Sequence, residues 1–228
     1  MANLDYNTLY SNEYKFNEYW FDNLSPLWES IFNHYKNQNP NFKINKALEI
    51  GCYEGRATIW LANNILESGC EYDIIDTFGG SEVETGMEGT LERFKDKPDF
   101  IYENFQHNIS FHKDIKWNVT RNMSNKFLPT LDLTPKYDFI YIDASHQSDD
   151  TFVDGYYAHK MLKPGGLLIF DDYGWGDPNN KDINHSPRAG INAFTNLYSN
   201  SYKVFEGDDG KSLYQKYLIK NTIRINNQ

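Results

Sequence analysis

The sequence has few cysteines and no long apolar run. Its two cysteines, Cys52 and Cys70, are too few for a disulfide framework, and their spacing is not that of a zinc site. We therefore predict two buried, reduced thiols in a cytoplasmic protein. No run approaches the roughly 20 apolar residues of a membrane span, and the first residues lack the basic and apolar segments of a signal peptide. These absences predict a protein without a membrane partner.

Basic residues are also scarce. The chain carries 22 lysines and arginines against 32 aspartates and glutamates, which gives a net charge of −10. A protein that binds nucleic acid normally presents a basic face, because phosphate neutralisation supplies much of its affinity. We therefore expect no nucleic-acid partner. Aromatic residues, in contrast, make up 16% of the chain, and the large area that each one buries predicts an aromatic-rich core.

Apolar runs alternate with helical patterns along the chain. Before them, residues 1–43 are predicted to form a helical appendage, with a helix that begins at Ser25-Pro26 and ends at 39–41. Residues 44–228 are predicted to form one α/β domain. The expected strands are 46–50, 72–76, 116–121, 137–142, 167–170, 202–205 and 212–219. The expected helices are 58–68, 90–108, 150–162 and 189–199, and a sharp turn is expected at 164–166.

Acidic residues stand at or near the ends of several expected strands. Apolar strands that alternate with helices are typical of a mainly parallel sheet with helices on both faces. Ligands bind to such sheets beyond the carboxyl ends of the strands. The acidic residues at these ends are Glu49, Asp76, Asp143, Asp171 and Asp172. Their placement predicts a ligand site at this edge of the sheet.

A short loop with two glycines follows the first of these strands. Gly51 and Gly55 lie four residues apart, where glycine lets the chain turn tightly and lets a ligand approach the backbone. The GxGxxG pattern is absent, which disfavours a nicotinamide cofactor. Asp76 ends the next strand, where a carboxylate can accept both hydroxyls of a ribose. An ordinary tight turn and an ordinary acidic cap remain the alternatives.

Three carboxylates and a histidine follow two strongly apolar strands. Asp143 ends one of these runs, and Asp171 and Asp172 end the other. If the two strands are neighbours, three like charges converge, and a hard divalent cation would remove their repulsion. His146 follows Asp143 by three residues and has an ordinary pKa suited to accepting a proton near neutral pH. The alternatives are aspartates that cap loops and a surface histidine.

Four segments resemble the motifs of class I S-adenosylmethionine-dependent methyltransferases. Residues 47–55 resemble the first motif of that class, and residues 76–80 resemble the acidic second-strand motif of one branch. Residues 137–146 and 162–173 are similar to the macrocin-type sugar O-methyltransferases, relatives of the metal-dependent catechol O-methyltransferases. The resemblance, over residues 45–218, implies a Rossmann-like sheet of seven strands. That sheet is mostly parallel with an antiparallel last strand, and helices cover both faces.

The resemblance also implies the catalytic and metal-binding residues. The domain at 44–228 is then a methyltransferase domain, with Mg²⁺ or another hard divalent cation as its metal. Asp143, Asp171 and Asp172 match the metal ligands, and His146 matches the general base.

By the same resemblance the cofactor is S-adenosylmethionine. The residues that match its site are Glu49, Gly51, Cys52, Tyr53, Gly55, Asp76, Thr77, Phe78, Ser124 and Asp143. Glu49, Gly51 and Gly55 would line the methionine end. Asp76 would bind the ribose, and Ser124 would lie near the adenine.

These features predict an O-methyltransferase that acts on a hydroxyl of a sugar, a glycoside or a nucleotide-sugar. His146 would remove the hydroxyl proton with the help of the metal. A catechol-like or other phenolic acceptor is the first alternative, because the same metal site serves both acceptors. A non-catalytic protein that binds S-adenosylmethionine is the second. The resemblance also leads us to expect a homodimer or a higher homo-oligomer.

Overall fold

The computed structural model describes residues 10–38, 40–80, 95–175, 183–205 and 214–222. The strands are β1 (Lys46–Ile50), β2 (Glu71–Asp76), β3 (Lys116–Arg121), β4 (Tyr137–Ile142), β5 (Leu162–Phe170), β6 (Tyr202–Val204) and β7 (Lys216–Lys220). The α-helices are α1 (Ser25–Gln38), α2 (Arg56–Asn64), α4 (Phe100–Ile109), α5 (Ser124–Phe127), α6 (Ser148–Met161) and α7 (Pro187–Leu197). Short 3-10 turns precede α1 and follow α5 and α7.

The seven strands form one sheet in the order β3-β2-β1-β4-β5-β7-β6. All neighbouring pairs from β3 to β5 are parallel, whereas β7 is antiparallel to both β5 and β6. The order of the strands reverses at β1, which has β2 on one side and β4 on the other, and ligands bind at such a reversal. The sheet confirms the predicted fold class, including the antiparallel last strand.

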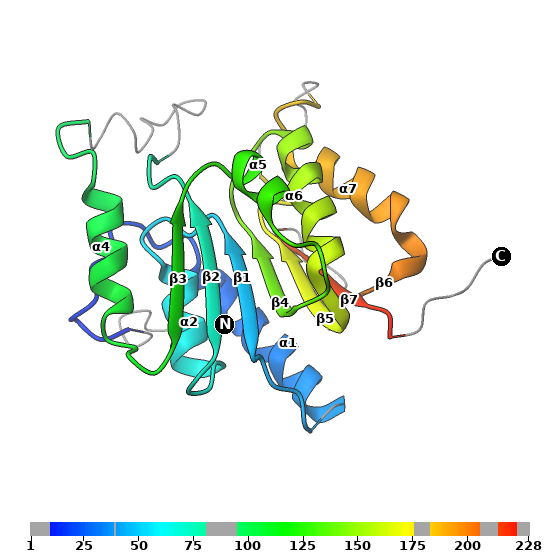
Figure 1. Cartoon of the computed structure of the whole chain (residues 1–228), viewed down its shortest axis with the longest axis horizontal. Coiled ribbons are helices and arrows are strands. Elements are labelled where there is room, and N and C mark those ends of the chain that lie inside the picture. The colour runs from blue at the N-terminus through cyan, green and yellow to red at the C-terminus, as the bar shows by residue number, and fades with distance from the viewer. Residues whose placement is uncertain (1–9, 39, 81–94, 176–182, 206–213, 223–228) are drawn as a thin grey trace.

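Helices cover the sheet on both faces (Figure 1). Side chains of α1, α2 and α4 pack on one face and those of α6 and α7 on the other, so each face has its own core. Successive residues of a strand point to opposite faces, as in β1, where Ala47 joins one core and Leu48 the other. The large side chains that are fully buried are mostly aromatic, as predicted, and include Trp28, Tyr72 and Tyr141.

The N-terminal helix packs into the first of these cores. Trp28 of α1 is fully buried, and its ring meets Trp60 of α2 and Tyr141 of β4 edge-on, with ring centroids 5.8 and 4.9 Å apart. Each such aromatic pair contributes about 0.5–1.5 kcal/mol beyond the burial of its area. Thus α1 shares its core with the sheet. The division into an appendage at 1–43 and a domain at 44–228 stays a prediction.

A buried ion pair connects the segment before α1 to the start of α2. Asp22 accepts hydrogen bonds from the Arg56 guanidinium, at 2.5 Å from Nε and 2.7 Å from Nη2. The rings of Tyr10, Phe16 and Tyr19 lie against the guanidinium, with centroids 4.4, 4.8 and 4.4 Å from its carbon. A planar guanidinium suits both contacts, because it pairs with a carboxylate at its edge and stacks on rings at its faces. Arg56 therefore serves this internal contact.

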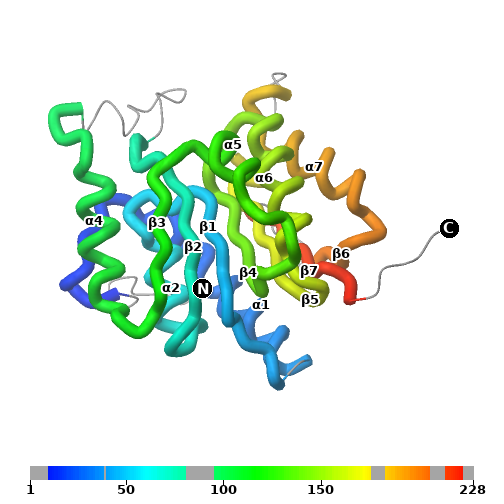
Figure 2. The backbone as a smooth tube through the Cα atoms, viewed as in Figure 1, coloured from blue at the N-terminus to red at the C-terminus, as the bar shows by residue number. Residues whose placement is uncertain are grey.

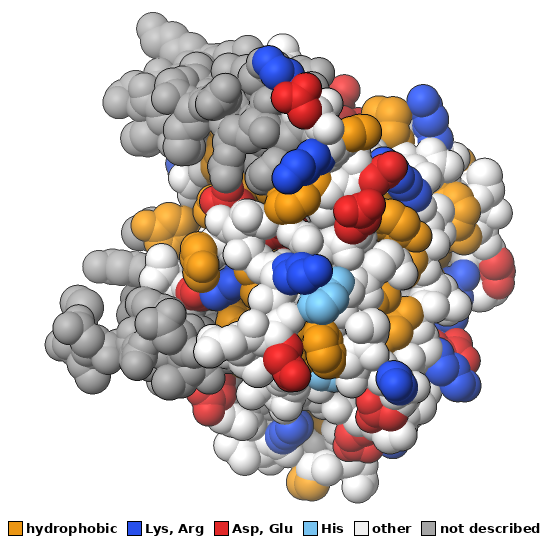
Figure 3. Space-filling view, turned by 90° about the vertical axis from the view of Figure 1, so that its left-hand side faces the viewer, with side chains coloured by type: hydrophobic (Ala, Val, Ile, Leu, Met, Phe, Trp, Pro, Cys, Tyr) orange, Lys and Arg blue, Asp and Glu red, His pale blue; other side chains and the backbone are white. Residues whose placement is uncertain are grey.

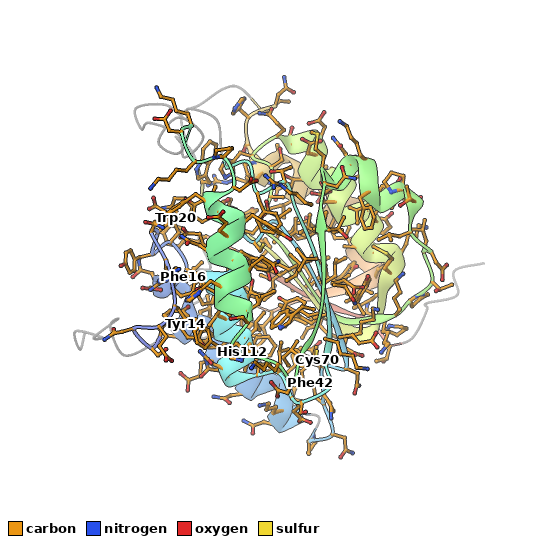
Figure 4. All side chains as sticks on the ribbon, turned by 60° about the vertical axis from the view of Figure 1, so that its left-hand side comes forward. Tyr14, Phe16, Trp20, Phe42, Cys70 and His112 are labelled. Carbon is orange, nitrogen blue, oxygen red and sulfur yellow. The ribbon has the colours of Figure 1, made fainter. Side chains whose placement is uncertain are left out.

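The same segment runs beside α4, as the path of the backbone shows (Figure 2). Tyr14, Phe16 and Trp20 follow one another along it in Figure 4, with Tyr14 next to His112. The Tyr14 hydroxyl lies 2.9 Å from His112 Nε2, beyond the end of α4. Farther along, the Trp20 ring lies 5.3 Å from the Tyr53 ring in the glycine loop. The segment therefore reaches from the end of α4 to the predicted site.

The face that carries α4 bears charges of both signs. Lysine and arginine side chains are interspersed with acidic ones among its described residues (Figure 3). Mixed charge is typical of a solvated surface rather than of a face that binds a phosphate chain. In the described ranges, no helix is long and apolar enough to cross a membrane.

Two local predictions are wrong. The sharp turn expected at 164–166 lies inside β5 as a bulge, because Tyr137 of β4 pairs with Leu162 and Phe139 pairs only with Leu167. Gly165 has a φ of +79°, so the strand bends there without ending. The helix expected at 58–68 is α2, which begins earlier because Gly55 serves as its N-cap, and ends at Asn64.

Other predictions agree with the structure or lie outside the described residues. Cys52 and Cys70 are free and buried, as predicted. The helix expected at 90–108 appears as α4, which begins only at Phe100, and the strand expected at 212–219 appears as β7, which begins only at Lys216. The first parts of both segments lie outside the described residues, as do 176–182 in the loop after β5.

Candidate active site

Backbone hydrogen bonds join the loops at the carboxyl ends of the central strands. The Asp143 amide donates to the carbonyl of the last residue of β1 at 2.8 Å. The Asp171 amide donates to the carbonyl of the last residue of β4 at 2.9 Å, and the Gly51 amide donates to the Ile75 carbonyl of β2 at 2.8 Å. These bonds extend the parallel pairing past the strands. The residues that follow the strands are thereby fixed at one edge of the sheet.

Gly51 lies where the loops after β1 and β4 come very close. Its φ is +80°, and a Cβ atom at this position would lie 1.8 Å from the Asp143 carbonyl oxygen. No side chain fits at that distance, and L-residues rarely adopt this φ. Gly55, also at φ +80°, is the N-cap of α2. One glycine is therefore required by a close approach of two loops and the other by the start of a helix.

Glu49 is buried in β1 and has partners inside the protein. The Thr58 hydroxyl donates to its Oε2 at 2.7 Å, and the Tyr72 hydroxyl donates to the same oxygen at 2.9 Å. Burial raises the pKa of Glu49 to about 8, although the two hydroxyls lower it in part. Glu49 thus connects β1, β2 and α2 beneath the glycine loop. Its contact with a cofactor stays a prediction.

Asp76 organises the glycine loop. Its Oδ2 accepts hydrogen bonds from the Cys52 amide at 2.6 Å and the Tyr53 amide at 2.9 Å, and its Oδ1 accepts one from the Phe78 amide at 2.6 Å. Tyr53 and Phe78 both have a φ of 52°, a conformation that non-glycine residues seldom adopt. The carboxylate therefore stabilises two unusual turns. Thr77 is exposed between them, and the ribose contact of Asp76 stays a prediction.

The structure brings Asp143, Asp171 and Asp172 together, because β4 and β5 are neighbours. Burial, and then the charges of the other two aspartates, raise the pKa of Asp143 well above its usual range. Burial and the charge of Asp172 raise the pKa of Asp171 in the same direction. Among the described residues, no lysine or arginine forms an ion pair with Asp143 or Asp171. Within the described part of the chain, Asp143 and Asp171 therefore concentrate negative charge without a lysine or arginine partner.

His146 lies against this cluster. Its Nε2 is 2.9 Å from Asp172 Oδ2, and the Trp175 ring stacks on the imidazole with centroids 4.1 Å apart. The backbone of Asp172 has a φ of 55°, a conformation that is rare outside glycine. His146 keeps 21% of its side chain exposed. It is thus oriented by two neighbours and still accessible to a ligand.

The donor chemistry of the three aspartates fits a hard divalent cation. Carboxylate oxygens are the ligands that Mg²⁺, Mn²⁺ and Ca²⁺ prefer, and a cation would offset the repulsion in the cluster. In the present side-chain positions, however, no group of three or more His, Cys, Asp or Glu side chains in the described part of the chain could hold a metal ion. Asp171 accepts a hydrogen bond from Gln215, and Asp172 lies next to His146. The metal site stays a prediction.

Ser124 opens α5, after β3, and lies near a further buried carboxylate. Asp154 of α6 is 1% exposed, and among the described residues neither of its side-chain oxygens has a well-formed hydrogen bond. Burial raises the pKa of Asp154 to about 7, and the nearby Ser124 hydroxyl offsets only part of this shift. The structure thus places Ser124 next to α6. Its contact with an adenine stays a prediction.

Replacing Asp154 by asparagine is expected to stabilise the protein at pH 8. The folded-state pKa of about 7 lies above the ordinary value of 3.8, so wild-type stability falls as the pH rises from the lower value through the higher one. The neutral amide avoids this loss, and the free energy of unfolding should rise by about 1–3 kcal/mol. Urea unfolding at pH 5 and pH 8 measures the gain, which should be smaller at pH 5.

Asp149, exposed in the first turn of the same helix, provides the control. Its replacement by asparagine should lower stability by about 0.3–1 kcal/mol at both pH values, because a carboxylate favours the start of a helix. A lower stability of Asp154→Asn at pH 8 would mean that the Asp154 carboxylate has a stabilising partner, contrary to this prediction.

The sequence of this region matches a known family. Residues 48–173, more than half of the chain, match the sequence model of a family described as a methyltransferase domain. The matched range starts in β1 and ends just after Asp172, so it contains the glycine loop and the carboxylate cluster. The chain belongs to this methyltransferase family. The resemblance found in the sequence is thereby confirmed. No curated protein sequence matches this methyltransferase at a significant level.

Several solved structures have the same fold. The O-methyltransferase TomG from Streptomyces achromogenes, involved in tomaymycin synthesis and solved with SAM, is 19% identical, with a TM-score of 0.54 over 88% of this chain and 80% of its own. An O-methyltransferase from Bacillus cereus, solved with SAH, is 19% identical, with a TM-score of 0.51 over 92% of this chain and 84% of its own. Cofactor-bound Rv0187 from MTB is 15% identical, with a TM-score of 0.53 over 93% of this chain and 85% of its own. At these identities the likeness shows the fold of the methyltransferase.

Three residues that contact the carboxylate cluster or its partners are absent from the sequence-based prediction. Tyr141 and Trp28 have the pattern of core aromatics, and Gln215 lies in a polar stretch. The contact of Tyr141 with Asp143 could have been predicted, because residues two apart in a strand point to the same face. No local signal exists for Gln215 or Trp28. Their contact with each other spans 187 residues of sequence.

Proposed function

We propose that this methyltransferase transfers the methyl group of S-adenosylmethionine to a hydroxyl of a sugar, a glycoside or a nucleotide-sugar. One observation carries the proposal. An accessible histidine, His146, lies 2.9 Å from Asp172, in a cluster that also contains Asp143 and Asp171. The close contact of Gly51 with Asp143 places this cluster beside the glycine loop. A proton acceptor and a methyl donor would therefore meet at one edge of the sheet.

The glycine loop and its neighbours are proposed to bind S-adenosylmethionine, which supplies an activated methyl group. The residues proposed to line this site are Glu49, Gly51, Cys52, Tyr53, Gly55, Asp76, Thr77, Phe78, Ser124 and Asp143. The position of the loop at the reversal of strand order supports this role. Two structurally similar O-methyltransferases solved with SAM or SAH support the choice of cofactor.

Asp143, Asp171 and Asp172 are proposed to hold a divalent cation, with Mg²⁺ as the first candidate. When bound, such a cation would polarise the acceptor hydroxyl and lower its pKa. The convergence of three carboxylates supports this proposal, because burial of like charges is costly without compensation.

His146 is the proposed general base. As the acceptor oxygen bonds to the methyl carbon, the carbon–sulfur bond breaks, its electron pair goes to sulfur, and His146 takes the hydroxyl proton. Trp175 and Asp172 keep the imidazole in one orientation, so little freedom has to be lost in the reaction. An alcohol depends on such a base more than the more acidic phenol does, which favours a sugar hydroxyl over a phenolic acceptor.

An acceptor panel, run with and without a chelator, tests the proposal. The protein is incubated with S-adenosylmethionine, Mg²⁺ and nucleotide-sugars, glycosides or catechols, and the formation of S-adenosylhomocysteine is measured. We expect transfer to a glycosyl hydroxyl. Removal of the metal with EDTA should lower the rate by about 100-fold or more, because a Lewis acid contributes several kcal/mol to such a reaction. Added Mg²⁺ should restore it.

Each part of the proposal has its own contrary outcome. A preference for catechols would contradict the sugar acceptor, and full activity in EDTA would contradict the metal. Calorimetric binding of S-adenosylmethionine without transfer to any acceptor of the panel would favour a non-catalytic binding protein.

A further inference from the structure

Gln215 connects distant parts of the chain beneath the carboxylate cluster. It lies directly before β7 and is fully buried. Its Oε1 accepts hydrogen bonds from Trp28 Nε1 of α1, at 2.7 Å, and from the Tyr217 hydroxyl. Its Nε2 donates to Asp171 Oδ2 at 2.8 Å. One side chain thus joins the N-terminal helix, the antiparallel strand and the cluster.

The partners of Gln215 fix the orientation of its amide. The Trp28 indole N–H can only donate a hydrogen bond, and an ionised Asp171 carboxylate can only accept one. If the amide were turned by half a rotation, its NH₂ group would face the indole N–H and its carbonyl would face the carboxylate. Both bonds would then be lost in a buried place, where unsatisfied polar groups are costly. A single orientation is therefore stable, and it directs an N–H group at Asp171.

Asp171 is held on both of its oxygens. Its Oδ1 accepts a hydrogen bond from the Asp172 amide at 2.7 Å. Its Oδ2 accepts bonds from Gln215 and from the hydroxyl of Tyr141, which also lies 3.1 Å from Asp143 Oδ2. Because the neighbouring carboxylates repel Asp171, the donors are needed to keep it in the cluster.

We infer that Gln215 is a positioning residue for the divalent cation, because it fixes Asp171, and that Trp28 in turn fixes Gln215. The inference rests on the proposed function, since it takes Asp171 as a metal ligand. Loss of a hydrogen-bond partner of a metal ligand typically weakens metal binding by about 10–100-fold. Both residues lie outside the range 48–173 that matches the family. The proposed support of the site therefore includes the N-terminal helix, outside the family-matched range.

Calorimetric titration with Mg²⁺ tests the inference without an acceptor. The full chain is used, and the variant Gln215→Met keeps the volume of the side chain but removes its polar atoms. We expect the affinity for Mg²⁺ to fall by about 10-fold or more. The affinity for S-adenosylmethionine should stay unchanged, since the glycine loop is not altered. A merely structural role would not separate these two affinities.

A second pair of variants tests the role of α1. Trp28→Phe keeps an aromatic ring in the core but removes the indole N–H that orients Gln215. We expect a smaller loss of Mg²⁺ affinity, about threefold, because Tyr217 still donates to the amide. Trp60→Phe is the matched control, since Trp60 packs edge-on against Trp28 in the same core. It should leave Mg²⁺ affinity unchanged.

The outcomes separate this inference from the proposed function. A wild-type protein that does not bind Mg²⁺ would contradict the metal part of the proposed function, and the inference with it. Wild-type binding together with equal or tighter binding by Gln215→Met would overturn the inference alone. Equal losses in Trp28→Phe and Trp60→Phe would assign the effect to packing and overturn the role of Trp28.

Discussion

Replacing His146 by alanine is expected to lower kcat for methyl transfer by about 10²–10⁴-fold, the usual contribution of a general base. The reason is that an alcohol is a poor nucleophile until it loses its proton, and alanine cannot accept one. The affinity for S-adenosylmethionine should change little, because His146 is not among the residues proposed to line the cofactor site. Steady-state kinetics with the best acceptor of the panel, together with calorimetry for the cofactor, measures both quantities.

His185 provides a nearby control for this experiment. It is exposed, and its Nε2 lies 3.0 Å from Nε2 of Gln147, the residue that follows His146. We expect His185→Ala to keep the wild-type kcat, because its ring contacts a neighbour of the proposed base and not the carboxylate cluster. If His146→Ala also keeps the wild-type kcat, the histidine is not the base.

Replacing Gly51 by alanine is expected to disrupt both stability and cofactor binding. The new Cβ would lie 1.8 Å from the Asp143 carbonyl oxygen and 2.8 Å from Ala144 Cα, so the backbone after β4 would have to move. Overpacking and the positive φ together should cost roughly 3 kcal/mol or more of unfolding free energy. A displacement of about 1 Å at the proposed site should also lower kcat about 100-fold. Urea unfolding measures the loss of stability, and calorimetry with S-adenosylmethionine measures the loss of cofactor affinity.

A Gly69 variant separates the cost of the positive φ from the cost of the steric overlap between the two loops. It lies in the turn before β2 with a φ of +85°, close to that of Gly51, but a Cβ atom there would meet no other atom within 4 Å. Gly69→Ala therefore carries the backbone cost alone, about 1–2 kcal/mol. Equal losses of stability in the two variants would show that the close approach of the loops contributes nothing.

The strands were predictable because each central strand is a short apolar run. The predicted bounds 46–50 and 137–142 are those of β1 and β4. The turn expected at 164–166 illustrates the limit of this reasoning. Proline and glycine mark turns through local preference, and here they form a bulge within β5, which pairs with β4 at Leu162 and again from Leu167. Local signals therefore identify the elements better than their ends.

The position of the site was predictable for a similar reason. The carboxyl ends of parallel neighbouring strands meet at one edge, so Asp143 and Asp171 had to approach each other once β4 and β5 paired. Their partners could not be predicted in this way. The bond between Trp28 and Gln215 joins residues 187 positions apart, and no pattern within a strand or a helix encodes it. Contacts of this kind follow only from the complete packing of the core.

The order of the strands in the sheet has a consequence for synthesis on the ribosome. β7 lies between β5 and β6, although it is made after both, and β6 is an edge strand whose neighbour is β7. The ribosome adds about 5–20 residues per second. β6 therefore cannot join the sheet until β7 has also been made. Gln215, directly before β7, reaches Asp171 in the same step. A nascent chain that has not yet made β7 thus contains the whole family-matched range and still lacks a donor in its carboxylate cluster.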